Sequence, residues 1–155
     1  RDSSTSRGLG DVYKRQLGEY VVLLGENGYQ FDIDISDKEA EIYVDLQGMK
    51  RITDNVFTNI RKYSDKSKTI DIRVYIDRRK VRIYFRNYIN PEGGKAESTH
   101  IGTLTCQKMA EEMNGSFTTC RKGKVYEATL TLPNMLDNDD SHVPTQGLTA
   151  ILSRK

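Results

Sequence analysis

Residues 45–64 read DLQGMKRITDNVFTNIRKYS, and this stretch decides the fold. Apolar side chains recur in it at steps of three and four residues, which is typical of a helix with one buried face. They are Met49, Ile52, Val56, Ile60 and Tyr63. Asp45 stands directly before them, where its carboxylate can accept hydrogen bonds from free backbone N–H groups. The pattern therefore predicts an amphipathic helix that begins after Asp45 and runs to about Ser64.

Strands are predicted on both sides of this helix, because apolar and polar side chains alternate there. The predicted strands cover residues 29–35, 41–44, 70–76, 81–86, 117–120 and 125–132. The last four form two hairpins, with turns at residues 77–80 and 121–124. In the first strand, one apolar face is expected to hold Tyr29, Phe31, Ile33 and Ile35. Further core residues are expected near the end of the chain, at Met109, Met113, Tyr126, Leu130 and Leu132.

Two further segments have a helical pattern. Residues 17–24 are predicted to be the end of a helix that stops at Gly25. Residues 101–113 are predicted to form a helix that Asn114 and Gly115 terminate. The order of the strands and helices predicts an α+β fold. We expect a two-layer α/β sandwich, with a mixed, mostly antiparallel sheet and helices on one face.

The two ends of the chain lack these patterns. Residues 1–16 are rich in Ser, Gly and Arg and look like translated sequencing-adapter read-through. We expect them to be a poorly ordered leader that is not native. Residues 134–155 are expected to form a C-terminal tail. The functional domain is therefore predicted to cover residues 17–133.

Composition narrows the classes of function. The length of 155 residues suits one domain. A formal net charge of +2 is too small to favour nucleic-acid binding. The sequence holds no apolar run of roughly 18 residues that would span a membrane. Cys106 and Cys120 lack CxxC spacing and favour free thiols of an intracellular protein over a disulfide. His100 and His142 are too far apart to suggest a metal site.

A polar stripe lies beside the apolar stripe of the long helix. Asn55, Asn59 and Lys62 stand at positions i, i+4 and i+7, and so fall within about 60° of one another. Amide oxygens suit a hard cation such as Mg²⁺, and a lysine adds positive charge for phosphate. The same residue types are common on a solvated helix edge. The spacing leaves both interpretations open.

The stripe resembles the N-box of the histidine kinase branch of the GHKL ATPases. That motif is an Asn, three residues, a second Asn, two residues, a Lys and an aromatic residue, matched here by Asn55, Asn59, Lys62 and Tyr63. The resemblance implies that Asn59 binds Mg²⁺, that Lys62 contacts phosphate and that Tyr63 lines the nucleotide pocket. Hydrolytic relatives have a Glu at the position of Asn55. Asn cannot act as a general base, so the resemblance implies phosphoryl transfer in place of efficient ATP hydrolysis.

A second resemblance concerns adenine. In this family an Asp at the end of a strand accepts a hydrogen bond from the adenine amino group, and Asn87 stands at that position. The amide oxygen of Asn87 can accept the same bond. The bond is weaker than one to a charged carboxylate. Asn87 is also a residue that simply ends a strand, and the sequence leaves that interpretation open.

The loop NPEGGKAESTHIG, residues 90–102, resembles the lid that closes over ATP in this family. The lid ends in a glycine pattern that opens a helix, and Gly102 matches its second glycine. The backbone at Gly102, Thr103 and Leu104 is therefore implied to bind phosphate at the helix start. His100 replaces the first glycine, and we expect no catalytic role for it.

Together these matches imply a Bergerat or GHKL-type fold and the ATP-binding catalytic domain of a two-component sensor histidine kinase. ATP and Mg²⁺ are the implied cofactors, and the cytoplasm is the implied location. The phosphorylated histidine would lie on a dimerisation helix absent from this chain, so the domain would not be active alone. A response regulator would be an indirect partner. The domain itself is expected to be monomeric and not to bind nucleic acid.

Three alternatives remain at this point. The first is a degenerate GHKL domain that binds nucleotide weakly or not at all and acts through protein contacts, which the changes at Asn87 and His100 motivate. The second is an unrelated α+β binding domain. The third is a serine kinase of the anti-sigma type, which shares the fold.

Overall fold

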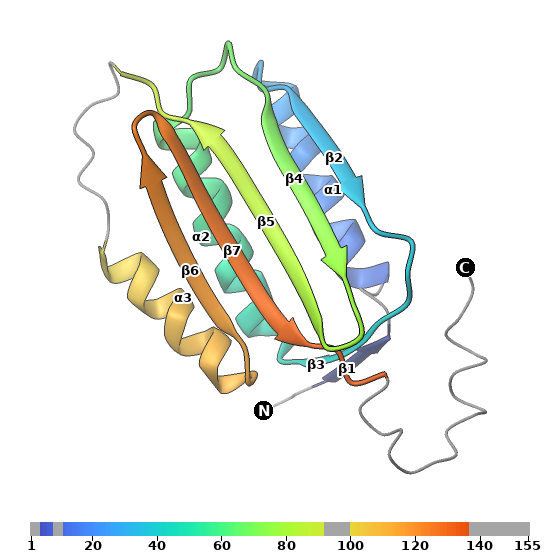
Figure 1. Cartoon of the computed structure of the whole chain (residues 1–155). Coiled ribbons are helices and arrows are strands. Elements are labelled where there is room, and N and C mark those ends of the chain that lie inside the picture. The colour runs from blue at the N-terminus through green and yellow to red at the C-terminus, as the bar shows by residue number, and fades with distance from the viewer. Residues whose placement is uncertain (1–3, 8–10, 92–99, 137–155) are drawn as a thin grey trace.

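The computed structural model describes residues 4–7, 11–91 and 100–136. Its elements are β1 (Ser4–Arg7), α1 (Asp11–Gly25), β2 (Phe31–Ile35), β3 (Glu41–Val44), α2 (Leu46–Tyr63), β4 (Ile70–Ile76), β5 (Lys80–Tyr88), α3 (His100–Glu112), β6 (Ser116–Lys122) and β7 (Val125–Pro133). One sheet has the strand order β2-β4-β5-β7-β6, and the helices lie against one of its faces (Figure 1). The predicted two-layer α+β sandwich is confirmed.

The sheet is mixed and mostly antiparallel. β2 runs parallel to β4, whereas β4–β5, β5–β7 and β7–β6 are antiparallel pairs. In the β5–β7 pair, Asn87 lies directly opposite Tyr126. β1 and β3 form a separate antiparallel ribbon. This register places Tyr126 of β7 next to Asn87 of β5, although the two residues are far apart in the sequence.

The core lies between the sheet and α2. The inward side chains of Ile72, Ile83 and Leu130 have exposed fractions of 0%. From α2, Phe57 stacks on Tyr20 of α1, with ring centroids 4.6 Å apart, and meets Phe85 edge-on at 5.8 Å. These contacts fix the rotation of α2 about its axis, so the polar stripe beside them is held at the edge of the core.

Of the expected core residues near the end of the chain, three are buried: Met113, Leu130 and Leu132. Met109 and Tyr126 are only partly buried and pack against the core. The expectation that these two are core residues was therefore wrong in part. For Tyr126 the reason is its place as the second residue of β7, next to the hairpin turn.

The ends of α2 and α3 lie where the sequence predicted them. The carboxylate of Asp45 accepts a hydrogen bond from the N–H of Gln47 at 3.3 Å, and the N–H of Ser64 donates to the carbonyl of Ile60 at 3.0 Å. After α3, Asn114 has a φ of 65°, and Gly115 donates its N–H to the carbonyl of Ala110 at 2.8 Å. A left-handed residue followed by this bond is a common helix stop.

The start of the chain differs from its prediction. The structure places residues 4–7 in β1 and residues 11–16 in α1, so the expected poor order of residues 1–16 is wrong for these segments. Tyr13 has an exposed fraction of 5% and lies in the core with Leu17. Tyr13 and Leu17 are four residues apart, so they share one face of the helix. That the leader is not native stays a prediction.

The domain was expected to end at residue 133, but the residues that follow also contact the folded part of the chain. Asn134 is buried, and its side-chain oxygen accepts hydrogen bonds from the N–H groups of Glu41, at 3.1 Å, and Leu136, at 3.0 Å. Its amide donates to the carbonyl of Asp77 at 2.8 Å. Asn134 thus joins β3 to the β4–β5 turn. The rest of the predicted tail, residues 137–155, lies outside the described residues.

The predicted apolar face of the first strand is only partly buried. Tyr29 is buried and precedes β2, while Phe31 and Ile35 are partly buried. Ile33 is 41% exposed, contrary to the prediction. The reason is that β2 is an edge strand, at the margin of the layer that the helices cover.

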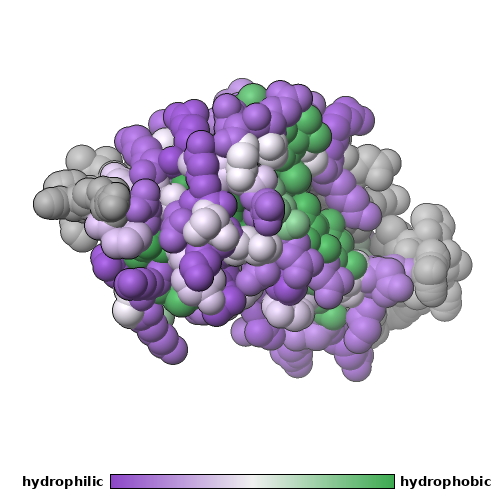
Figure 2. Space-filling view, turned by 90° about the horizontal axis from the view of Figure 1, so that it is seen from above, coloured by the Kyte–Doolittle hydropathy of each residue, from purple (hydrophilic) through white to green (hydrophobic). Residues whose placement is uncertain are grey.

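The face of the molecule that Figure 2 shows is mostly polar. Seen from above, hydrophilic residues dominate, and a band of hydrophobic residues crosses between them (Figure 2). No helix among the described residues is long and apolar enough to cross a membrane. Cys106 is buried and Cys120 is exposed, and both thiols are free, as predicted.

Candidate functional site

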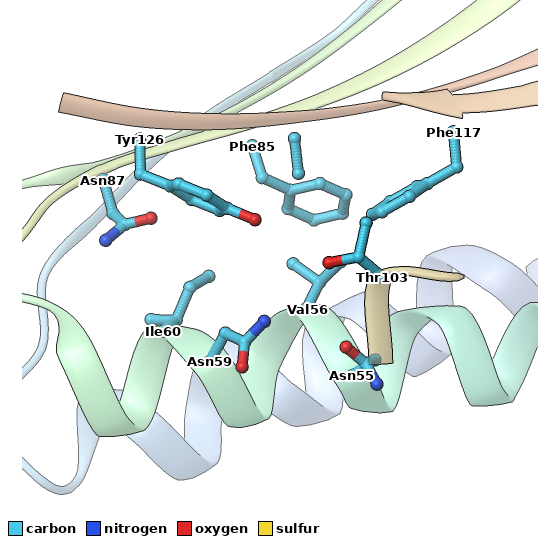
Figure 3. A pocket seen from close by; sticks show the side chains of 10 residues that line it. Asn55, Val56, Asn59, Ile60, Phe85, Asn87, Thr103, Phe117 and Tyr126 are labelled. Carbon is cyan, nitrogen blue, oxygen red and sulfur yellow. The ribbon is translucent and has the colours of Figure 1, made fainter. Parts of the chain in front are cut away.

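A small cavity lies between α2 and the sheet, beside the start of α3 (Figure 3). Its lining residues are Asn55, Val56, Asn59 and Ile60 from α2, Thr103 from α3, and Phe85, Asn87, Phe117, Tyr126 and Ala128 from the sheet. Four of the predicted site residues therefore meet at one place, although they come from three separate stretches of the sequence: Asn55, Asn59, Asn87 and Thr103.

Local periodicity explains why the asparagines face one another. Asn55 and Asn59 are one helical turn apart and flank the buried Val56. On β5 every second residue from Val81 onward is buried, and Asn87 ends this inward series. Figure 3 shows the Asn87 side chain pointing from the sheet toward α2. The site therefore follows from a helix stripe and a strand face that meet across the core.

Asn87 is buried, with an exposed fraction of 4%. Its amide donates to the carbonyl of Tyr88 at 3.4 Å, which is long for an N–H···O bond. A buried amide with weak partners costs free energy in an apolar layer. The structure thus favours the interpretation of Asn87 as a cavity residue over that of a residue that only ends a strand.

Gly102 lies directly against Asn55. A Cβ built at Gly102 would lie 2.8 Å from Nδ2 and 3.0 Å from Oδ1 of Asn55. Real Cβ atoms essentially never approach other atoms to within 3.0 Å, so a side chain at this position requires Asn55 to move. The absence of a side chain at Gly102 therefore sets how closely the start of α3 approaches the polar stripe of α2.

We expect Gly102→Ala to turn the Asn55 side chain while changing the free energy of unfolding by less than about 1 kcal/mol, because alanine favours helix and the clash is with the end of a flexible side chain. In ¹⁵N–¹H spectra the side-chain amide signals of Asn55 should shift. Gly18→Ala is the control, since nothing lies within 4 Å of a Cβ there. Unchanged Asn55 signals would show that α3 moves instead.

The other predicted site residues lie outside the cavity. Lys62 is exposed, Tyr63 is half-buried, and Leu104 is 61% exposed. The carbonyl of Tyr63 accepts a hydrogen bond from the N–H of Asn90 at 2.7 Å, which ties the end of α2 to the start of the predicted lid. Residues 92–99 of that lid and the side chain of His100 lie outside the described part of the chain.

Sequence reasoning did not identify Tyr126 as a site residue. Burial raises the pKa of its hydroxyl, and a hydrogen bond with Thr119 acts in the opposite direction. Tyr126 lies 39 positions after Asn87 in the sequence, yet directly opposite it in the sheet. A local pattern carries no signal for that pairing.

The polar groups that line the cavity are three amides and the hydroxyls of Thr103 and Tyr126. Among the described residues, no group of three or more His, Cys, Asp and Glu side chains could hold a metal ion. An amide oxygen of Asn59 fits Mg²⁺, since this ion keeps several waters and takes few protein ligands when it also binds phosphate. The residues present therefore fit a cation that a phosphate group brings with it.

The cavity that the described residues line between α2 and the sheet is too small for a purine. The cavity has a volume of about 10 Å³, which is room for about one water molecule. Pockets for small ligands are typically some 300–1,000 Å³. A nucleobase between α2 and the sheet therefore requires at least one lining side chain to move.

By sequence, the chain is similar to a curated sensor histidine kinase. Sensor histidine kinase YrkQ of Bacillus subtilis (strain 168) is 26% identical over 118 residues, which are 76% of this chain and 27% of that protein. The chain thus spans about a quarter of that relative's length. No family model matches the chain.

Solved structures show the same fold. The catalytic domain of histidine kinase ThkA, in a nucleotide-free form, superposes with a TM-score of 0.67 at 17% identity, over 86% of this chain and 99% of that one. A histidine kinase from Burkholderia phymatum STM815 gives 0.69 at 11%, over 86% and 71%. Histidine kinase AdeS of Acinetobacter baumannii gives 0.65 at 12%, over 86% and 68%. The resemblance seen in the sequence is confirmed, and the chain has the fold of a sensor histidine kinase catalytic domain.

Proposed function

We propose that this chain is the ATP-binding catalytic domain of a two-component sensor histidine kinase. It would supply the γ-phosphate of ATP to a histidine on a dimerisation helix outside this chain, and that histidine would pass the phosphate to a response regulator. The observation that carries the proposal is the convergence of Asn55, Asn59 and Asn87 on one cavity. The similarity to a curated sensor histidine kinase supports it.

The chemistry of the side chains is consistent with phosphate transfer to a partner. When bound, ATP and Mg²⁺ supply the phosphoryl group and the charge that neutralises it. Asn59 would hold Mg²⁺ through its amide oxygen, and Lys62, one turn further along α2, would add positive charge near the phosphates. Asn55 cannot remove a proton from water, so rapid hydrolysis of ATP is not expected. Thr103 and the backbone at the start of α3 would contact phosphate.

The direct test is calorimetric titration of the full chain with ATP, with and without Mg²⁺. Saturable binding that Mg²⁺ strengthens is the expected result. A folded chain that shows no heat of binding at millimolar ATP would contradict the proposal.

Two observations favour a second candidate function, a protein-interaction module that has lost nucleotide binding. The cavity of about 10 Å³ is too small for a purine in this structure, and the adenine-binding position holds Asn87 in place of an acid. This candidate predicts no ATP binding in the titration. It also predicts that the chain still contacts the histidine-bearing helices of its own kinase, which a pull-down with those helices would detect.

Replacing Asn87 by aspartate should strengthen ATP binding relative to GTP, by about 1 kcal/mol, or roughly fivefold. The reason is that a carboxylate accepts a stronger hydrogen bond from the adenine amino group than an amide does, and GTP has no amino group at that position. Competition titrations of both nucleotides would measure the ratio. Asn27→Asp is the control, since Asn27 is exposed after α1 and does not line the cavity. An unchanged ATP to GTP ratio would show that Asn87 does not contact adenine.

A further inference from the structure

The ring of Tyr126 lies within the layer where a nucleobase would have to sit. Figure 3 shows it extending from β7 beneath the sheet, between Asn87 on one side and Thr103 on the other, above Ile60 and Asn59 of α2. The next residue on the same face of β7 is the small, buried Ala128, which also lines the cavity. What remains of the cavity is about 10 Å³.

Tyr126 is less buried than the other aromatic residues that line the cavity, Phe85 and Phe117. Phe85 has an exposed fraction of 3% and packs edge-on against Phe57, and Phe117 has an exposed fraction of 5%. Moving either ring would open the core. Tyr126 is only partly buried and is the second residue of β7, beside the turn at Gly123. For its ring to leave the cavity, the hydrogen bond with Thr119 must break, whereas Phe85 and Phe117 can stay packed in the core.

We propose that Tyr126 is a gate residue of this site, whose ring must leave the space between Asn87 and α2 before a nucleobase can enter. Tyr126 then determines affinity and selectivity for the nucleobase, while the asparagines of α2 act on the phosphate and metal side. This inference rests on the proposed nucleotide-binding function. Tyr126 thus weakens nucleotide binding in the native chain, because part of the binding free energy is used to displace its ring.

The test compares ATP affinity in the full chain and two variants by calorimetry. Tyr126→Ser removes the ring, and its ATP affinity should rise about tenfold, the order of free energy that burying an aromatic side chain supplies. Tyr126→Phe keeps the ring but loses the hydrogen bond with Thr119, so it should bind ATP more weakly than Tyr126→Ser. Tyr75→Ser removes a half-exposed tyrosine from the opposite face of the sheet and should change nothing.

The outcomes separate the gate from the function on which it rests. Equal ATP affinity in the native chain and in folded Tyr126→Ser overturns the gate and leaves the proposed function intact. No binding in either chain overturns both. ATP binding that appears only in Tyr126→Ser supports the gate and explains why the native chain shows no binding.

A second measurement covers the case in which Tyr126→Ser does not fold. N-acetylimidazole acetylates accessible tyrosine hydroxyls, and mass spectrometry can follow Tyr126 in the native chain. Labelling of Tyr126 should rise at least about twofold at saturating ATP, while labelling of Tyr75 stays constant. Labelling of Tyr126 that does not change with ATP overturns the proposal.

Discussion

Replacing Gly115 by alanine is expected to destabilise the domain by about 3 kcal/mol or more. A Cβ at this position would lie 2.0 Å from the carbonyl oxygen of Thr131 and 3.0 Å from Cδ2 of Leu132. Thr131 belongs to β7, a strand paired on both sides, so its carbonyl cannot move freely. Gly115 is itself held by the hydrogen bond to Ala110 that ends α3. Relief of the clash therefore requires α3 or the sheet to shift.

Urea unfolding followed by circular dichroism would measure this loss. Gly25→Ala is the matched control, because nothing lies within 4 Å of a Cβ built at Gly25. That variant should change the free energy of unfolding by no more than about 1 kcal/mol. If Gly115→Ala lost less than about 1 kcal/mol, the turn between α3 and β6 would be far more adaptable than these contacts indicate.

The elements that the sequence predicted well are those that local physics determines. α2 could be predicted because its cap, its apolar stripe and its last turn all lie within residues 45–64. β3 and β4 have the predicted bounds, and in β4 buried residues alternate with more exposed ones along the whole strand. The stop of α3 was visible in Asn114 and Gly115, whose residue types suit a left-handed turn.

What the sequence could not supply depends on contacts between distant segments. The parallel pairing of β2 with β4 joins residues about 40 positions apart and has no local signature. The start of α1 was missed because only Tyr13 is buried among residues 13–16. A single buried residue does not form an apolar stripe that would predict a helix. The exposure of Ile33 likewise follows from the edge position of β2, which pattern alone does not reveal.

The candidate site likewise contains residues that the sequence predicted and one that it did not. Helical spacing placed Asn55 and Asn59 on one stripe, and the family resemblance predicted them as site residues. Asn87, Gly102 and Thr103 were predicted from the resemblance alone. The structure places all of them at or beside the cavity. Lys62, Tyr63 and Leu104 lie outside it, and their roles stay proposals. Tyr126 was missed because its position depends on the register of β5 with β7.

Replacing Asn59 by alanine is expected to weaken Mg-ATP binding by about tenfold to a hundredfold, because a hydrogen bond or ligand bond to a charged group contributes about 1.5–3 kcal/mol. Asn59 is half-buried on α2, and its side chain faces the cavity (Figure 3). Alanine is a better helix former than asparagine, so the fold should not suffer. Calorimetric titration with ATP in the presence of Mg²⁺ measures the loss, and thermal unfolding checks the fold.

The dependence on Mg²⁺ distinguishes a metal ligand from a general contact. If Asn59 holds the ion, the alanine variant should bind ATP with nearly the same affinity with and without Mg²⁺, whereas the native chain gains from the ion. Gln47→Ala is the control, because it removes an exposed amide from the first turn of the same helix. A variant that keeps its full gain from Mg²⁺ would place the ion elsewhere, and Asn59 would then be only a residue of the cavity wall.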